Sequence, residues 1–262
     1  MKKIFYTLLL TILMTNSVFG AIFTGGVTKV DQQESNRVID AQTNQGVEFA
    51  KISIPQKNIR TYTDANGNFT LPKIQINQPT ILSVEKEGYR PFSVTINNNE
   101  SLNTPMKITI AKSTPTDISL DSEIIHLGDD SYSKNSANAA DFRLKSAGPY
   151  YSKDFIMTDN AKKSTNYLII GSIVGLDTKL ARTMGQNKIR TAYSSPAQVF
   201  FNGKIIGQLQ INGDGQRIKI PNPLIIPNKR NQITIKTGQN MMPGNGLDYD
   251  DIEILNLSIL SE

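Results

Sequence analysis

The sequence predicts an all-β protein made of two β-sandwich domains. The pairs Asn66-Gly67 and Asn202-Gly203 each stand between short runs of β-branched and aromatic residues, the strongest local signal for a tight antiparallel turn. From Met106 to Ala111 apolar and polar residues alternate, so one strand face meets a core and the other meets water. Residues 113–122, rich in Ser, Thr and Pro, separate two patterned regions and predict an interdomain linker.

The N-terminus has the three parts of a secretory signal peptide. Lys2 and Lys3 precede an apolar run over residues 4–14, and small residues follow at Gly20 and Ala21. We expect residues 1–20 to be removed and the protein to be secreted, periplasmic or at the cell surface. A retained anchor is the alternative, but it would need about 20 apolar residues. The absence of Cys excludes a lipobox anchor and disulfides.

Charge excludes some partner classes. Two of the 28 Lys and Arg residues leave with the signal peptide, so 26 remain against 23 Asp and Glu, a net charge of +3. Because the basic residues are scattered, we expect neither nucleic-acid nor anionic-membrane binding. About 240 residues remain, enough for two modest domains. Residues 21–36 are a flexible lead-in or an edge strand.

Residues 37–112 repeat short strands and turns, without helical periodicity, and carry four ordered motifs. These are Arg37-Val-Ile-Asp-Ala41, the run Val47 to Ile54 around Ala50, Thr63-Asp64 with Gly67-Asn-Phe69, and Gly88-Tyr89. The set resembles the carboxypeptidase regulatory-like domains, transthyretin-like sandwiches that accompany many secreted bacterial proteins. Asn36 and Phe49 stand where that family usually has glycine, so two turns should be built differently. Asp64 is expected to fix its turn through nearby backbone N–H groups rather than to bind metal.

Residues 123–262 predict a second, larger antiparallel sandwich, which we expect to fold independently of the first. Its clearest part is a hairpin over residues 195–211 with a type I′ turn at Asn202-Gly203. Near the C-terminus, Ile252 and Ile254 would point to one face of a regular strand and Leu257 to the other, so either both faces are buried or a bulge intervenes.

Three segments of this second region resemble galactose-binding-like jelly rolls, which accompany glycoside hydrolases and adhesins as carbohydrate-binding modules. They are Val199 to Gly207, Pro227 to Ile235 and the closing run Leu247 to Leu257. The resemblance implies a glycan or surface glycoconjugate as the partner. The first sandwich would then be a structural spacer.

Catalysis is not expected. His126 is the single histidine, and no Ser lies in a Gly-x-Ser-x-Gly turn, so triads and histidine-based zinc sites are excluded. We expect His126 to be structural. A cryptic glycosidase remains as an alternative, because it would need only two carboxyl groups about 5 to 9.5 Å apart. Its conceivable members are Asp154, Asp159, Asp177, Asp250 and Glu253.

Two acidic clusters suggest a structural Ca²⁺, since this hard cation prefers carboxylate and carbonyl oxygens. Similar jelly rolls often hold calcium between their first and last strands. Turn capping and protection of strand edges are the alternatives. The candidate ligands are Asp129, Asp130, Asp250 and Asp251.

Sugar binding usually needs an aromatic ring flanked by hydrogen-bonding groups. The chain has no Trp, so tyrosines must serve, and the two longest unpatterned stretches of the second domain are residues 175–187 and 238–251. The expected ligand-binding residues are Arg182, Tyr193, Asn240, Asp248 and Tyr249. A second function class is an assembly protein of the cell envelope, which would act through exposed sheet edges on a protein partner.

Overall fold

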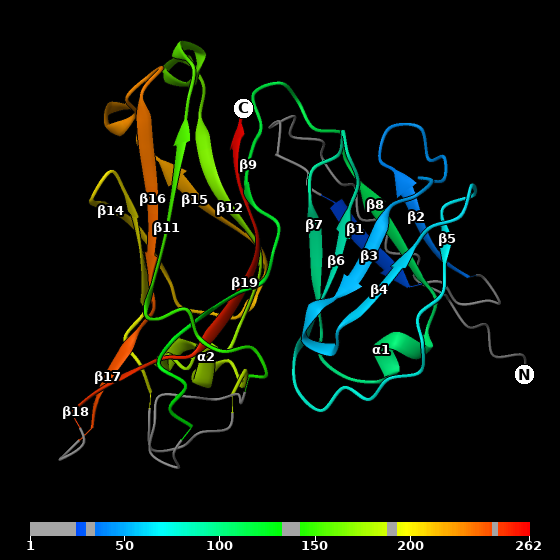
Figure 1. The fold of residues 1–262 in the computed structure, drawn as a ribbon, viewed down its shortest axis with the longest axis horizontal. Coiled ribbons are helices and arrows are strands. Elements are labelled where there is room, and N and C mark those ends of the chain that lie inside the picture. Colours follow the sequence, from blue (N-terminus) through cyan, green and yellow to red (C-terminus); the bar gives the residue numbers. More distant parts are fainter. Residues whose placement is uncertain (1–24, 30–34, 133–141, 188–192, 243–245) are drawn as a thin grey trace, which may run out of the picture.

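The computed structural model describes residues 25–29, 35–132, 142–187, 193–242 and 246–262. The expected signal peptide, residues 1–20, lies outside this part. Four main β-sheets stack as two sandwiches, which lie side by side in Figure 1. The all-β sandwich prediction is confirmed. Among the described residues, no helix is both long and apolar enough to cross a membrane.

The first sandwich packs two four-stranded sheets around one core. One sheet has the order β1-β8-β2-β5, with β1 at Gly25–Lys29, β8 at Met106–Ile110, β2 at Asn36–Asp40 and β5 at Asn68–Phe69. The other has the order β4-β3-β6-β7, with β4 at Ile59–Tyr62, β3 at Lys51–Ile54, β6 at Thr80–Glu85 and β7 at Phe92–Ile96. Short helices η1 (Pro55–Lys57) and α1 (Glu100–Asn103) lie in connections. Since β1 pairs with β8, the segment 21–36 contains an edge strand.

The Asn66-Gly67 turn joins the two sheets instead of closing a hairpin. Strand β4 before it and β5 after it belong to different sheets, so the expected antiparallel pairing is wrong. The local chemistry is as expected: the Asp64 carboxylate accepts the N–H groups of Asn66 at 2.9 Å and Asn68 at 2.8 Å. The role of Asp64 in fixing the turn is confirmed. Phe49 adopts a left-handed φ of 53°, a conformation that favours glycine.

The second sandwich also packs two sheets. The inner one has the order β10-β19-β12-β15, with β9 also paired to β19; the outer one has the order β11-β16-β13-β14. The strands are β9 (Ile118–Asp121), β10 (Ile125–Leu127), β11 (Tyr150–Ile156), β12 (Asn166–Val174), β13 (Ala197–Phe201), β14 (Lys204–Leu209), β15 (Gly213–Ile220), β16 (Arg230–Lys236) and β19 (Ile252–Ser261). A separate ribbon pairs β17 (Gln239–Met242) with β18 (Gly246–Tyr249). The short helices are η2 (Asp159–Lys163), α2 (Lys179–Thr183) and η3 (Asn222–Leu224).

The hairpin of β13 and β14 is confirmed. Asn202 and Gly203 have φ angles of 48° and 76°, as a type I′ turn requires. Strand β19 is buried on both faces, and Asn256 within it has a φ of 60°. Both alternatives left open by the sequence are thus present. The positions whose side chains point into the sandwich core change from even to odd numbers at Asn256, and both faces of the strand are buried.

The linker expected over residues 113–122 is only partly a linker. Residues 118–121 form β9, which pairs with β19. Before it, Arg90 and Asp117 form an ion pair at 2.8 Å. The Ser/Thr/Pro composition concealed the alternation of Ile118 and Leu120, which lets this segment pair with an otherwise open edge.

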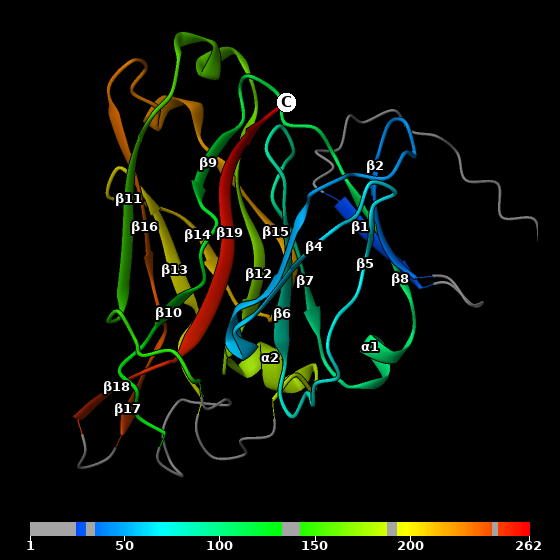
Figure 2. The ribbon, with the colours of Figure 1, turned by 45° about the vertical axis from the view of Figure 1, so that its right-hand side comes forward.

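The two sandwiches share a buried interface, formed where the sheet β4-β3-β6-β7 faces the inner sheet of the second sandwich. The hydroxyl oxygens of Ser93 and Ser172 form a hydrogen bond at 2.9 Å, and Asn256 donates to Ser83 at 3.3 Å. Ile81, Phe142, Val174 and Leu255 form a small apolar cluster there. Figure 2 shows β19 between the first sandwich and the outer sheet of the second. The independent folding expected from the Ser/Thr/Pro composition of residues 113–122 assumed that few contacts cross this boundary, whereas hydrogen bonds and an apolar cluster do cross it.

Candidate functional site

The residues expected to bind sugar lie at one end of the second sandwich, where Figures 1 and 2 both show α2 and the β17–β18 ribbon in the lower part of the molecule. The Arg182 guanidinium, on α2, lies 5.3 Å from the centre of the Tyr193 ring. Asn240 stands opposite Asp248 in the ribbon, and Tyr249 follows Asp248. The structure therefore brings together two pairs of these residues.

Their accessibility differs. Tyr193 is 50% exposed, but Arg182 lies over its ring. Asp248 is only 6% exposed, which withdraws it from any surface ligand. Tyr249 is half-buried, and its N–H donates to Asp129 Oδ2 at 2.9 Å. Of the five expected residues, Asp248 is thus the buried one, whereas Tyr193 is exposed and Arg182, Asn240 and Tyr249 are partly exposed.

The four expected calcium ligands do not act alike. Asp129 Oδ1 accepts the N–H of Ser131, and Asp130 accepts that of Ser146. Asp251 Oδ1 accepts the N–H of Asp130 at 3.1 Å. These three carboxylates therefore fix the backbone between β10 and β11, which is the turn-capping alternative. Asp250 faces a different set of groups, described below.

His126 is held in this network as a cation. Its Nε2 lies 2.7 Å from Asp251 Oδ1, and its Nδ1 contacts the carbonyl oxygen of Leu144. Both partners are acceptors, so both ring nitrogens must carry protons. Burial alone would lower the pKa of His126, but these hydrogen bonds and the charges of Asp251 and Glu253 raise it.

This network also contains a three-residue group of possible metal ligands. Ligand atoms of His126, Asp130 and Asp251 lie within 4.8 Å of one another. A doubly protonated imidazole has no lone pair for a metal, so the group is an ion-pair network. The structural role expected of His126 fits this geometry.

Asp177 and Asp250 meet in the interior, at the base of the loop that carries α2. Both side chains are 0% exposed. The N–H of Asp177 donates to Asp250 Oδ2 at 3.1 Å, and Ser194 Oγ donates to the same oxygen at 2.6 Å. Burial raises the pKa of Asp177 to about 7, although Arg182 lowers it and Asp248 adds to the rise. Burial also raises the pKa of Asp250 well above its ordinary value.

The other acids considered for a glycosidase have individual partners. Asp154 forms an ion pair with Arg230 at 2.7 Å, and Asp159 accepts from Asn228 at 2.8 Å. Glu253 is fully buried in the interface between the sandwiches, where Gln56 Nε2 donates to it at 2.9 Å. Burial raises the pKa of Glu253 to about 7, although Gln56 and His126 lower it.

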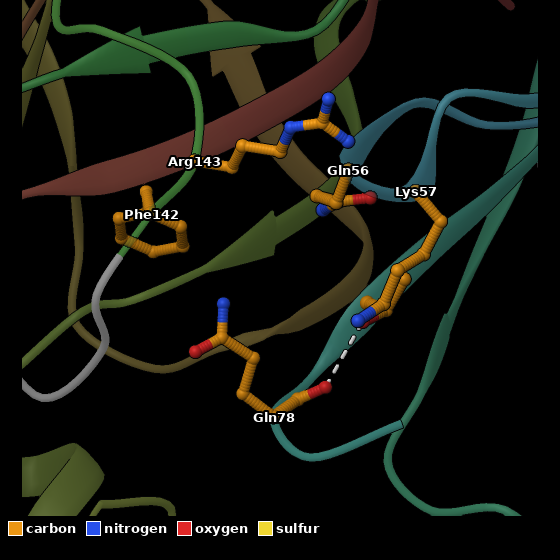
Figure 3. Close-up of a pocket in the computed structure, with 6 residues that line it drawn as sticks. Gln56, Lys57, Gln78, Phe142 and Arg143 are labelled. Carbon is orange, nitrogen blue, oxygen red and sulfur yellow. Dashed lines mark hydrogen bonds between the residues drawn. The ribbon is translucent and has the colours of Figure 1, made fainter. Parts of the chain in front are cut away.

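Three of the hollows in the described part of the chain lie along the boundary between the sandwiches, and two of them share a lining residue. The first, of about 350 Å³, is shown in Figure 3, where the Phe142 ring, the Gln78 amide and the Lys57 side chain surround the space. Gln56, Thr80 and Arg143 complete its lining. The second hollow, of about 660 Å³, is also bordered by Gln78. The two hollows, which we call the interdomain cleft, meet at this residue.

The larger hollow is polar and firmly held. The Gln186 side-chain amide donates to the carbonyl oxygen of Asn212 and accepts the N–H of Asn212, both at 2.9 Å. Asp214 accepts the N–H and hydroxyl of Thr95 at 2.9 and 2.7 Å, which ties the two sandwiches together at its floor. Within the described part of the chain, the buried amide oxygen and nitrogen of Asn187 have no hydrogen-bond partner.

The comparison with family models supports the first domain. Residues 35–119 match the model described as "CarboxypepD_reg-like domain". The resemblance expected from the four motifs is confirmed for this part of the chain. A search of curated proteins found no match to the sequence. No fold family is thereby assigned to the second sandwich.

Among solved structures, the chain is similar to "The crystal structure of Ruminococcus gnavus beta-glucuronidase". The TM-score is 0.27 and the identity 12%, over 71% of this chain and 30% of that chain. The chain thus spans less than a third of that protein's length. A likeness of this strength does not establish a shared fold.

Sequence reasoning missed the part of the cleft that comes from the first sandwich. Gln56 and Lys57 lie in η1, and Gln78 lies just before β6. Nothing in their local pattern separates them from ordinary surface residues. They line one hollow only because Phe142 and Arg143, which are far away in the sequence, dock against them. The cleft residues within the predicted loop 175–187 are Gly175, Gly185, Gln186 and Asn187.

Proposed function

We propose that this protein is an exported, non-catalytic binding protein that holds a carbohydrate or glycoconjugate in the interdomain cleft. The lysines and apolar run at the N-terminus support export. In this proposal the first sandwich forms half of the binding site and is more than a spacer. Residues of the expected loop 175–187 line the site, whereas none of the described residues of the 238–251 loop does.

The composition of the cleft carries the proposal. A sugar presents hydroxyl groups, which pair with amides and cations, and C–H faces, which pack on rings. Lys57, Arg143 and Gln78 offer donors around the smaller hollow, and the Phe142 ring forms an apolar wall. The larger hollow adds the amide of Asn97, which is exposed.

The acids favour binding over hydrolysis. Among the described residues that line the two hollows, Asp214 is the one carboxylate. It already accepts hydrogen bonds from Thr95 and from the Ser172 hydroxyl. Glycoside hydrolysis by the usual mechanisms needs a second carboxyl group across the scissile bond. This arrangement supports the non-catalytic proposal over the cryptic glycosidase.

A glycan array followed by calorimetry with the best ligand tests the proposal on the full exported chain. Loss of one charge-assisted or amide hydrogen bond should cost about 1 to 3 kcal/mol, so Lys57→Ala, Gln78→Ala and Arg143→Ala should each weaken binding roughly five-fold or more. Lys204→Ala, an exposed lysine in the β13–β14 hairpin, is the matched control.

The same experiment separates the two locations. If Arg182→Ala and Tyr193→Ala weaken binding while the cleft variants do not, the glycan sits at the end of the sandwich. Unchanged affinity in all of these variants would reject both sites. No glycan signal from the intact chain would reject the carbohydrate function.

The second candidate function is an assembly protein of the cell envelope, favoured by the outer sheet. Its two edge strands, β11 and β14, carry Ile156 at 65% exposure and Ile205 at 57%. Exposed apolar side chains on open edges suit pairing with a strand of a protein partner. Cross-linking in the native envelope, compared between the wild type and an Ile205→Lys variant, tests this: an unchanged cross-link pattern would contradict it.

A further inference from the structure

Two acidic side chains are buried without the partners that burial demands. Asp177 and Asp250 are both 0% exposed. Within the described part of the chain, neither carboxylate oxygen of Asp177 has a hydrogen-bond partner, and Oδ1 of Asp250 has none. An ionised carboxylate in such a place loses several kcal/mol of hydration unless a cation or donor replaces the water.

The surrounding hydrogen bonds leave these three oxygens free while they fix the two backbones. Ser194 Oγ and the N–H of Asp177 both donate to Oδ2 of Asp250. The N–H of Ser194 donates to the carbonyl oxygen of Asp177 at 2.9 Å, and the N–H of Asp250 donates to that of Gly238 at 3.0 Å. The loop that follows β12 is thereby held against the segment between β18 and β19.

The electrostatic surroundings add negative charge. Asp248, nearly buried, acts on Asp177, and Asp251 acts on Asp250. Arg182 is the one cation whose charge acts on Asp177 among the described residues. One guanidinium does not balance the two buried carboxylates of Asp177 and Asp250. A mobile positive ion would complete the charge balance.

We propose that Asp177 and Asp250 bind a divalent cation, with Ca²⁺ as the ion that fits best. Ca²⁺ takes six to eight oxygen ligands in a flexible arrangement, whereas Mg²⁺ demands a near-ideal octahedron and keeps several waters. The three free carboxylate oxygens supply part of that shell. Main-chain carbonyl oxygens and water would supply the remainder.

This site differs from the one expected from the sequence. Asp129, Asp130 and Asp251 are occupied by backbone N–H groups and His126, whereas Asp250 turns to Asp177. The proposed ion would join the end of β12 to the start of β19. It would stabilise the base of the loop bearing Arg182 and would not depend on the proposed glycan function.

The competing explanation is that these acids are protonated in the folded protein. A protonated pair needs no cation and would be most stable at low pH. Replacement of Asp177 by Asn distinguishes the two cases, because the amide keeps the shape and removes the charge. If the acid is protonated, Asp177→Asn is neutral or stabilising; if it binds Ca²⁺, the variant loses the response to calcium.

Thermal unfolding of the full chain at about pH 8, where free carboxyl groups are ionised, provides the test. The protein is first stripped with EDTA and then titrated with Ca²⁺ or, as a selectivity control, Mg²⁺. At a calcium concentration about 100-fold above Kd, the midpoint should rise by about 5 to 10 °C. Asp177→Asn and Asp250→Asn should abolish this rise, whereas Asp154→Asn, on the exposed β11 strand, should retain it.

A direct measurement covers the case in which a variant fails to fold. Calorimetric titration of the stripped wild type should give one calcium ion per chain. A wild type that neither binds Ca²⁺ nor changes its midpoint would overturn the proposal. Retention of the full response by Asp177→Asn would overturn the assignment of these ligands.

Discussion

Glu253→Gln should stabilise the protein at alkaline pH, because it removes a charge buried between the sandwiches. Burial raises the pKa of Glu253 to about 7 from an ordinary value of 4.5, and its Oε1 has no partner among the described residues. The group is fully buried, so its ionisation in the folded state is unfavourable. Glutamine can still accept the hydrogen bond from Gln56 Nε2 and carries no charge.

The magnitude follows from the pKa shift. A pKa raised by about 2.5 units corresponds to about 3 kcal/mol of instability once both states are ionised. The charge of Glu253 also attracts the His126 cation, and the loss of that attraction in the variant offsets part of the gain in stability. We therefore expect Glu253→Gln to raise the free energy of unfolding by about 1 to 3 kcal/mol at about pH 8.

The sign of the pH dependence is equally specific. The folded-state pKa of Glu253 is raised, so its unfavourable ionisation is absent below about pH 4 and develops as the pH rises through about 7. The wild type and the variant should thus have similar stability near pH 4 and diverge above it.

Urea unfolding followed by far-ultraviolet circular dichroism, in EDTA throughout, measures these free energies. Glu48→Gln, at an exposed position, is the matched control and should change little. A Glu253→Gln variant that is less stable than the wild type at alkaline pH would refute the reasoning. So would a gain of the same size at every pH.

Three further changes test other parts of the structure. Phe49→Gly should raise the free energy of unfolding by about 1 kcal/mol in a urea titration, because glycine adopts the φ of 53° without a side-chain clash; a loss would show that the exposed ring is needed. Gly171→Ala should lower the free energy of unfolding by about 1 to 3 kcal/mol, since the added Cβ would lie 2.5 Å from Ser93 Oγ. Ser93→Ala in the same chain should recover part of this loss. Additive effects of the two substitutions in the double variant would contradict this contact. His126→Gln should destabilise the protein most below about pH 6.5. The difference in stability between variant and wild type should shrink as the pH rises through the raised folded-state pKa of His126, because the wild type then also loses the imidazolium–Asp251 pair. A pH-independent difference in unfolding midpoint would show that His126 is neutral.

The sequence alone determined the features that depend on neighbours along the chain. The type I′ turn at Asn202-Gly203 follows from residues that tolerate positive φ between two strand-forming runs. Asp64 binds backbone groups only two and four residues away, so its role could be read from spacing. The four motifs of the first sandwich likewise depend on short-range order, and their family resemblance was confirmed.

The tertiary structure decided everything that depends on how the two sandwiches dock. The Asn66-Gly67 pair gave a correct turn but could not specify which sheet each flanking strand joins. Ser83 is buried only because a second sheet covers it, and Gln78 becomes part of a cleft only through that docking. The same holds for Asp177 and Asp250, which are 73 residues apart and meet because the ends of β12 and β18 converge. Local periodicity specifies strands and turns, whereas burial of polar groups depends on long-range packing that no single segment records.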